Sequence, residues 1–136
     1  MIFVDSNIWC YYFDSSSEEH KAVSEFMDEK LDNEEIALNT VVVMEVSHFL
    51  IKNLGGEEGE NKIDKFLSFP FRVVDFDYSL MYDSVDQLVE ESEAGIGGRD
   101  ATILASMDHL DVEELITHDK AFKKIENVNV IDPVEL

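Results

Sequence analysis

Short apolar runs alternate with segments of helical periodicity along this chain, and that alternation limits the folds open to it. The expected strands are residues 2–5, 36–38, 71–76, 115–117 and 128–131. The expected helices are residues 6–14, 18–31, 40–53, 58–68, 77–93, 99–110 and 120–125. Short buried strands that lead into helices favour a mostly parallel sheet with helices on both faces. The sequence therefore predicts an α/β fold.

Local signals place several helix ends. Ser17 is expected to cap the helix from residue 18, and Thr40 the helix that follows it. Gly55 and Gly56 predict the end of the second of these helices, and Pro70 the end of the next. The 136 residues contain no internal repeat or long linker, so we expect one domain over 1–136.

Four carboxylates lie next to apolar runs, where an unpaired charge is costly. Asp5 ends the first run, Glu45 interrupts the helix over 40–53, Asp100 opens an apolar helix, and Asp119 follows a strand. Asp5 and Asp119 thus lie at carboxyl ends of strands, where open α/β sheets bind ligands. Few basic residues are nearby, so a cation is expected to complete the site. Carboxylate oxygens are typical ligands of Mg²⁺ and Mn²⁺.

Each acid also has an ordinary structural interpretation. Asp5 and Asp119 are suitable helix caps, and Asp100 lies in a first helical turn, where it favours the helix dipole. Glu45 lies on a helix that is apolar nearly all round, which predicts burial, although Lys52 is a possible salt-bridge partner on the same face. We favour one metal site formed by all four acids, because otherwise the position of each acid beside an apolar run would need its own explanation.

The formal net charge is −21, from 31 acidic and 10 basic residues. Most of the acids fall in clusters expected on a solvated surface, of the kind that keeps proteins soluble in concentrated salt. This charge argues against a broad nucleic-acid-binding surface. It remains compatible with a nucleic-acid substrate held by a metal and a few basic residues.

Other chemistries have less support. No apolar run approaches a membrane span, and no positively charged leader precedes the first strand, so a cytoplasmic location is expected. Cys10 is the only cysteine, which excludes an intrachain disulfide. The four histidines show no paired metal-ligand spacing, so a structural zinc site is not supported. No Ser-His-Asp or Cys-His arrangement is visible.

The acidic segments together resemble the PIN-domain nucleases, especially the small single-domain VapC-like type. The matching segments are Val4–Asn7, the helix containing Glu45, Arg99–Ile103 and Leu115–Phe122. The resemblance implies a Rossmann-like three-layer α/β/α sandwich and RNA cleavage with Mg²⁺ or Mn²⁺. It implies that Asp5, Glu45, Asp100 and Asp119 are the catalytic, metal-binding acids. It also implies that Asn7 and Thr117 support them. Some relatives carry a further acid where this chain has Ala121.

Three functional interpretations stay open at this point. A VapC-like toxin would have an antitoxin partner, an RNA-processing nuclease would not, and a catalytically silent module would only bind. A phosphorelay receiver or a haloacid-dehalogenase-like phosphatase would need a second acid close to Asp5, which Ser6 and Asn7 do not supply.

Two contact surfaces are also predicted. Arg99 and Lys120 adjoin proposed metal ligands, so we expect them to contact RNA phosphates. The aromatic segment 8–13 and a second apolar region around Phe66 belong either to the core or to an exposed patch. VapC-like proteins commonly dimerise, so we expect a homodimer in which Trp9 or Tyr11 contributes to a partner groove.

Overall fold

The computed structural model describes residues 1–136 and contains a five-stranded parallel sheet in the order β3-β2-β1-β4-β5. The strands are β1 (Ile2–Val4), β2 (Ile36–Asn39), β3 (Arg72–Val74), β4 (Glu114–Ile116) and β5 (Asn129–Ile131). The helices are α1 (Ser6–Phe13), α2 (His20–Asn33), α3 (Thr40–Leu54), α4 (Gly56–Ser68), α5 (Tyr78–Glu90), α6 (Gly98–Leu110) and the 3₁₀ helix η1 (Lys120–Lys124).

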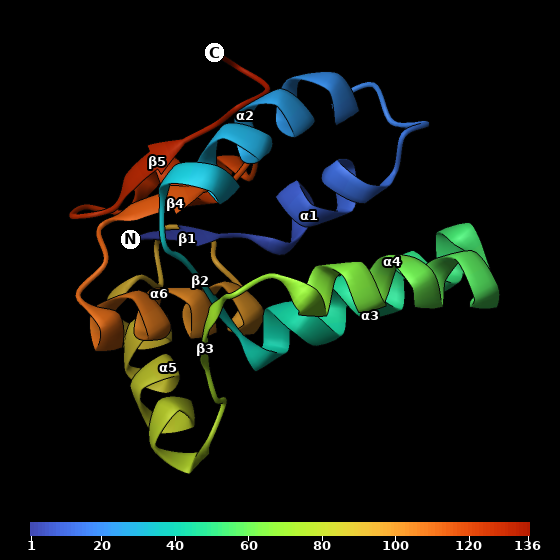
Figure 1. Cartoon of the computed structure of the whole chain (residues 1–136). Helices are drawn as coiled ribbons and strands as arrows, with labels where there is room; N and C mark the ends of the chain where they lie inside the picture. Colours follow the sequence, from blue (N-terminus) through green and yellow to red (C-terminus); the bar gives the residue numbers. More distant parts are fainter.

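Helices cover both faces of the sheet. In Figure 1, α2 lies at the top, α1 lies to the right of β1, α5 and α6 lie at the lower left, and α3 and α4 extend to the right. Strand β1 is central: the chain moves outward from it to β2 and β3, then returns to its other side for β4 and β5. This order creates a topological switch point between β1 and β4, where ligands bind beyond the carboxyl ends of strands. The α/β architecture expected from the sequence is confirmed.

The buried strands form the centre of the core. All of β1 and β2 is buried, as are Leu115 and Ile116 of β4. Their apolar side chains belong to one cluster of 23 buried residues that continues into the helices. Strands apolar on both faces are typical of a parallel sheet covered on two sides. This packing fixes the strand ends that carry the polar residues described below.

Two predicted helix caps are wrong. Asn39, not Thr40, caps α3, because its side chain accepts a hydrogen bond from the Val42 N–H. Ser17 does not cap α2, which begins at His20, because its hydroxyl donates to the Asp14 carbonyl within the preceding turn. Short polar side chains compete for several nearby backbone groups, so the sequence alone did not decide between neighbours.

Helices α3 and α4 form a close hairpin. Gly55 ends α3 with φ of 86°, as the glycine pair predicted. Gly59 lies so near α3 that a Cβ there would approach the Leu50 carbonyl oxygen to 2.8 Å. Met44 of α3 is nevertheless 68% exposed. The expectation that this helix is buried all round is therefore wrong, because the hairpin extends past the sheet (Figure 1).

Trp9 is fully buried and packs against the rings of Phe66 and Phe71, with centroids 5.2 and 5.1 Å away. Its predicted part in a partner groove is wrong: the aromatic segment and the second apolar region meet each other in the core. The Trp9 Nε1 has no hydrogen-bond partner there. Tyr11 is half-buried. None of the helices combines the length and apolar composition that crossing a membrane requires.

Candidate active site

Asp5 is the first residue after β1 and is fully buried. It caps α1, because Oδ1 accepts a hydrogen bond of 2.7 Å from the Ser6 N–H. Its other oxygen, Oδ2, accepts bonds from Thr117 Oγ1 at 2.7 Å and Asn7 Nδ2 at 3.2 Å. The cap expected from the sequence is real, yet a cap alone does not require so many partners for both oxygens.

Thr117 and Asn7 join the ends of β1 and β4. The Thr117 hydroxyl donates to Asp5 and accepts from the Asp119 N–H at 3.0 Å. Asn7 donates to the same hydroxyl at 3.3 Å and accepts from the His118 N–H at 3.2 Å. Thr117 and Asn7 therefore fix the segment that carries Asp5 against the segment that carries Asp119. Asp5 and Thr117, which meet here, are 112 residues apart in the sequence.

Arg99 connects three of the four predicted acids. Its Nη1 lies 3.3 Å from Asp5 Oδ1 and 3.1 Å from Glu45 Oε1, while its Nη2 lies 2.9 Å from Asp100 Oδ1. Nη1 also donates to Ser6 Oγ at 2.8 Å. These acids come from the end of β1, from α3 and from α6, so the fold gathers side chains distant in sequence. The alternative partner of Glu45, a lysine seven residues on, makes no ion pair with it.

The environments of these acids differ. Glu45 is 36% exposed at its side chain, contrary to the expected burial. Burial raises the pKa of Asp5, and the hydrogen bond from Thr117 and the charge of Arg99 offset part of that rise. Burial also raises the pKa of Asp100, and Arg99 again opposes the effect. Negative charge is therefore costly at these two buried acids, and the charge of Arg99 offsets only part of that cost.

Asp119, the fourth predicted acid, makes no ion pair with Arg99. Its negative charge contributes to the raised pKa of Asp100, which shows that the two carboxylates are within electrostatic reach. Asp119 Oδ1 accepts from the Ala121 N–H at 3.0 Å and caps η1. Lys120 is exposed beside it, whereas Arg99 is bound to carboxylates. The sequence predicts the same phosphate-binding role for both residues, but in the structure only Lys120 is free of carboxylate partners.

An open cavity of about 620 Å³ leads to this cluster between α1 and α3. Its lining includes Asn7, Tyr11, Glu45 and Arg99. Cys10 also lines it, but burial and the neighbouring carboxylates raise the pKa of its thiol to about 12. A thiol that stays protonated is a poor nucleophile, so Cys10 has no support as a nucleophile here.

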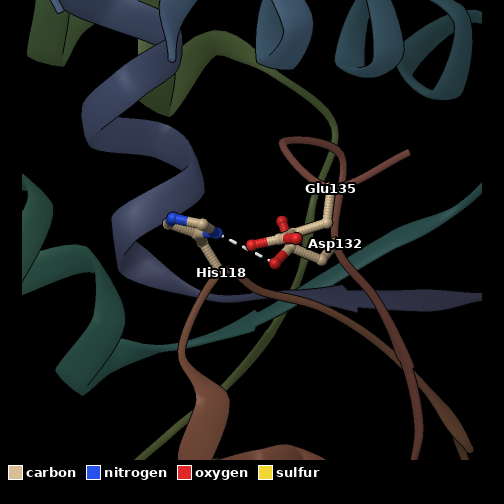
Figure 2. Close-up of side chains that lie close together, drawn as sticks. All are labelled: His118, Asp132 and Glu135. Carbon is tan, nitrogen blue, oxygen red and sulfur yellow. Dashed lines mark hydrogen bonds and ion pairs between the residues drawn. The ribbon is translucent and has the colours of Figure 1, made fainter. Parts of the chain in front are cut away.

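A second polar cluster lies at the end of β5. Figure 2 shows His118, Asp132 and Glu135, whose potential ligand atoms all lie within 4.8 Å of one another. His118 Nδ1 is 2.9 Å from Asp132 Oδ2, and Lys123 Nζ lies 3.4 Å from the same oxygen. The lysine already supplies Asp132 with a cationic partner. This cluster is therefore explained as a clamp between the last strand and the loop after β4.

The ligand atoms of the four predicted acids do not all lie within 4.8 Å of one another, as those of His118, Asp132 and Glu135 do. The guanidinium of Arg99 lies between three of the acids and explains the wider spacing. One guanidinium among three carboxylates leaves a formal charge of −2. Three of the four oxygens that accept from this guanidinium belong to carboxylates, the ligand type preferred by Mg²⁺ and Mn²⁺. A guanidinium standing among them shows that these oxygens favour a cation. The donor set therefore fits a divalent metal at Asp5, Glu45 and Asp100.

Two residues of this region escaped the sequence argument. Ser6 accepts a hydrogen bond from Arg99, a contact that its place in the segment Val4–Asn7 does not predict. Asp132 follows the last strand just as Asp5 and Asp119 follow theirs, so its position was an available signal. No sequence pattern predicts that Arg99 bridges three acids, because this contact depends on how α3 and α6 are placed relative to each other.

Comparisons with known proteins agree on the fold. The sequence matches the family model of the PIN domain over residues 2–128. No curated protein matches it. The structure is similar to VapC20 of Mycobacterium tuberculosis, described as a Sarcin-Ricin loop cleaving toxin, with 21% identity, a TM-score of 0.79, and coverage of 90% of this chain and 93% of that one.

Two complexes are similar as well. VapBC2 from Rickettsia felis, bound to a DNA fragment from its promoter, matches with 23% identity, a TM-score of 0.76 and coverage of 97% and 98%. A toxin-antitoxin complex from Klebsiella pneumoniae matches with 23% identity, a TM-score of 0.72 and coverage of 98% of both chains. These likenesses extend over whole chains and thus describe the complete fold.

Proposed function

The chain belongs to the PIN domain family, and from that premise we propose that it is a Mg²⁺- or Mn²⁺-dependent endoribonuclease. Its site is formed by Asp5, Glu45, Asp100 and Asp119. Its biological role is that of the toxin in a toxin-antitoxin pair. The alternatives are an RNA-processing nuclease without an antitoxin and a PIN-like module that binds RNA without cleaving it.

One observation carries the proposal: buried or half-buried carboxylates from separate elements converge on a single cation, Arg99. They do so at the switch point of the sheet and beside an open cavity. A fold does not need to place three acids together for stability, since their mutual repulsion opposes folding. Such an arrangement is instead typical of a site that binds cations.

Asp5, Glu45 and Asp100 would hold the metal, and Asp119 would complete the set on the β4 side. When bound, the metal activates a water molecule and neutralises charge on the phosphoryl group. The protein supplies position: Thr117 fixes the carboxylate plane of Asp5 and the backbone of Asp119. The cavity beside Glu45 admits the RNA strand, and exposed Lys120 contacts its phosphates.

Cleavage of a labelled single-stranded RNA by the purified protein tests this proposal. We expect cleavage with Mg²⁺ or Mn²⁺, none in EDTA, and none of an aryl phosphate, which a phosphatase would hydrolyse. Asp100→Asn should be inactive under the same conditions, which excludes a contaminating nuclease. Binding of RNA without cleavage at any metal concentration would favour the silent module, and hydrolysis of the aryl phosphate would overturn the proposal.

The proposed toxin role rests on the similar structures, which include a toxin and a toxin-antitoxin complex. It implies a protein partner that covers the cavity beside Arg99 and Glu45. The product of a neighbouring reading frame, co-expressed with this chain, should copurify with it and suppress RNA cleavage. An RNA-processing nuclease would show neither effect, so this assay separates the two roles.

We also propose a homodimer, because apolar side chains remain exposed along one face of α5. Tyr78, Tyr82, Val85 and Val89 follow helical spacing and are all exposed. Such a stripe is unusual on a monomer surface and suits a protein interface. Sedimentation at high salt, which screens the acidic surfaces, should give a dimer. Val85→Glu should give a monomer, and a monomeric wild type would contradict this part.

A further inference from the structure

Arg99 occupies the centre of the proposed metal site. Its guanidinium bonds to one oxygen of each of Asp5, Glu45 and Asp100, at 3.3, 3.1 and 2.9 Å. No lysine or other arginine makes an ion pair with these acids. Burial alone would lower the pKa of Arg99, but the three carboxylates raise it, so this side chain stays charged.

The same oxygens are those that a divalent cation would need. Metal–oxygen distances for Mg²⁺ are about 2.1 Å, so the ion would lie among the three carboxylates. A guanidinium bonded to those oxygens takes up that volume and repels a second positive charge. Arg99 and a metal therefore compete for Asp5 Oδ1, Glu45 Oε1 and Asp100 Oδ1.

We propose that Arg99 is the built-in counter-cation of this site, and that a divalent metal binds the carboxylates by displacing its guanidinium. This inference rests on the metal site of the proposed function. The side chain is 32% exposed, so it has an open path into the cavity that it lines. The displaced guanidinium remains beside the site and becomes free to contact an RNA phosphate.

A role for Arg99 in orienting the acids predicts the opposite effect of its removal on metal affinity. If the arginine held the acids in a shape that the metal requires, its removal would weaken metal binding. If it competes with the metal, removal strengthens binding. The affinity for metal alone, without RNA and without turnover, therefore distinguishes the two roles.

The experiment is a titration of the full chain with Mn²⁺, in which free ion is measured by electron paramagnetic resonance. Arg99→Gln should bind Mn²⁺ about tenfold more tightly than the wild type. Arg72→Gln is the matched control: it removes the same charge from the exposed edge strand β3 and should leave the affinity within about twofold. Equal or weaker binding by Arg99→Gln would overturn the inference.

Arg99→Gln leaves the buried carboxylates without a cationic partner, so a second measurement uses the wild type. Arg72 and Arg99 are the only arginines, which makes the guanidinium signals of ¹⁵N-arginine-labelled protein simple to assign. The ion-paired Arg99 should give slowly rotating, separate Nη signals without metal. Saturating Mg²⁺ should release them into fast averaging, while Arg72 stays unchanged. Retention of the ion-paired signals at saturation would overturn the inference.

These outcomes are separable from the proposed function. If the wild type cleaves RNA with metal but Arg99→Gln binds Mn²⁺ more weakly than the wild type, only the proposed role of Arg99 is refuted. A protein that exchanges Arg99 for Mn²⁺ but never cleaves RNA refutes only the ribonuclease. Failure of both proteins to bind Mn²⁺ would refute the displacement together with the metal site.

Discussion

The guanidinium of Arg99 donates a hydrogen bond of 3.1 Å to Oε1 of Glu45, joining the start of α6 to the middle of α3. The same group reaches Asp5 and Asp100. The proposed site is therefore one electrostatic network, in which a change at one acid alters the others. Effects of substitutions within it should not be additive.

Loss of a ligand acid should remove activity without removing the fold. Asp5→Asn and Asp100→Asn are each expected to lower metal-dependent RNA cleavage at least about a hundredfold, because each removes a charged metal ligand. Circular dichroism should stay unchanged. Asp64→Asn, an exposed acid on α4, is the matched control and should retain full activity. Near-normal cleavage by either ligand variant would remove that residue from the site.

Replacing Asp5 by asparagine should stabilise the metal-free protein. Burial raises the pKa of this residue, so its ionised form costs stability once the pH exceeds both the unfolded and folded values. In EDTA at pH 7, Asp5→Asn should therefore unfold at a higher temperature than the wild type. The difference should disappear as the pH falls towards 3.8, the ordinary value. A lower unfolding temperature at pH 7 would contradict this electrostatic account.

Thr117 should act through position and not through direct chemistry. Thr117→Val removes the hydroxyl between Asp5 and Asp119 and should lower kcat about 10- to 100-fold with a smaller change in KM. Thr117→Ser keeps the hydroxyl and should restore most of kcat. If valine and serine gave equal rates, the hydroxyl would have no role in placing the acids.

Asp132 should contribute to acid sensitivity. Burial alone would raise its pKa, but hydrogen bonds from His118, the Val134 N–H and Lys123 lower it below the ordinary value. Its ionised form therefore stabilises the fold above about pH 4, and this contribution is lost as the pH falls through the folded value. Asp132→Asn should lower stability at pH 7 by about 1–3 kcal/mol and flatten the loss of stability below pH 4. A denaturant series at several pH values measures both.

Lys120 should contribute to RNA affinity through charge alone. In the inactive Asp100→Asn background, Lys120→Gln should weaken RNA binding and reduce the slope of log affinity against log salt by about 0.7. Lys65→Gln, on the exposed side of α4, removes the same charge elsewhere and is the control. An unchanged salt slope for Lys120→Gln would show that this lysine does not contact phosphate.

The sequence predicted the order of strands and helices because its short apolar runs and helical periods are clear. Boundaries moved by a few residues, as with β3, which spans Arg72–Val74 within the expected 71–76. The caps at Ser17 and Thr40 were misplaced because neighbouring polar side chains compete for the same backbone groups. Such local competition depends on turn geometry that composition does not reveal.

The site was predicted as a set of acids but not as a network. Strand ends located Asp5, since every parallel strand delivers its last residue to the same edge. The partial exposure of Glu45 was missed because a helix that is apolar all round in sequence can project from the domain. The burial of Trp9 was undecided because its partner Phe66 is distant in sequence. The position of Arg99 depends on three elements at once, which no local pattern encodes.

The location of bound Mn²⁺ in crystals of the protein tests the central claim most directly. An anomalous difference map recorded with Mn²⁺ should show a peak coordinated by Asp5, Glu45 and Asp100, with Asp119 facing it and the Arg99 guanidinium withdrawn. A peak at His118, Asp132 and Glu135, with Arg99 still bonded to the three acids, would contradict the account.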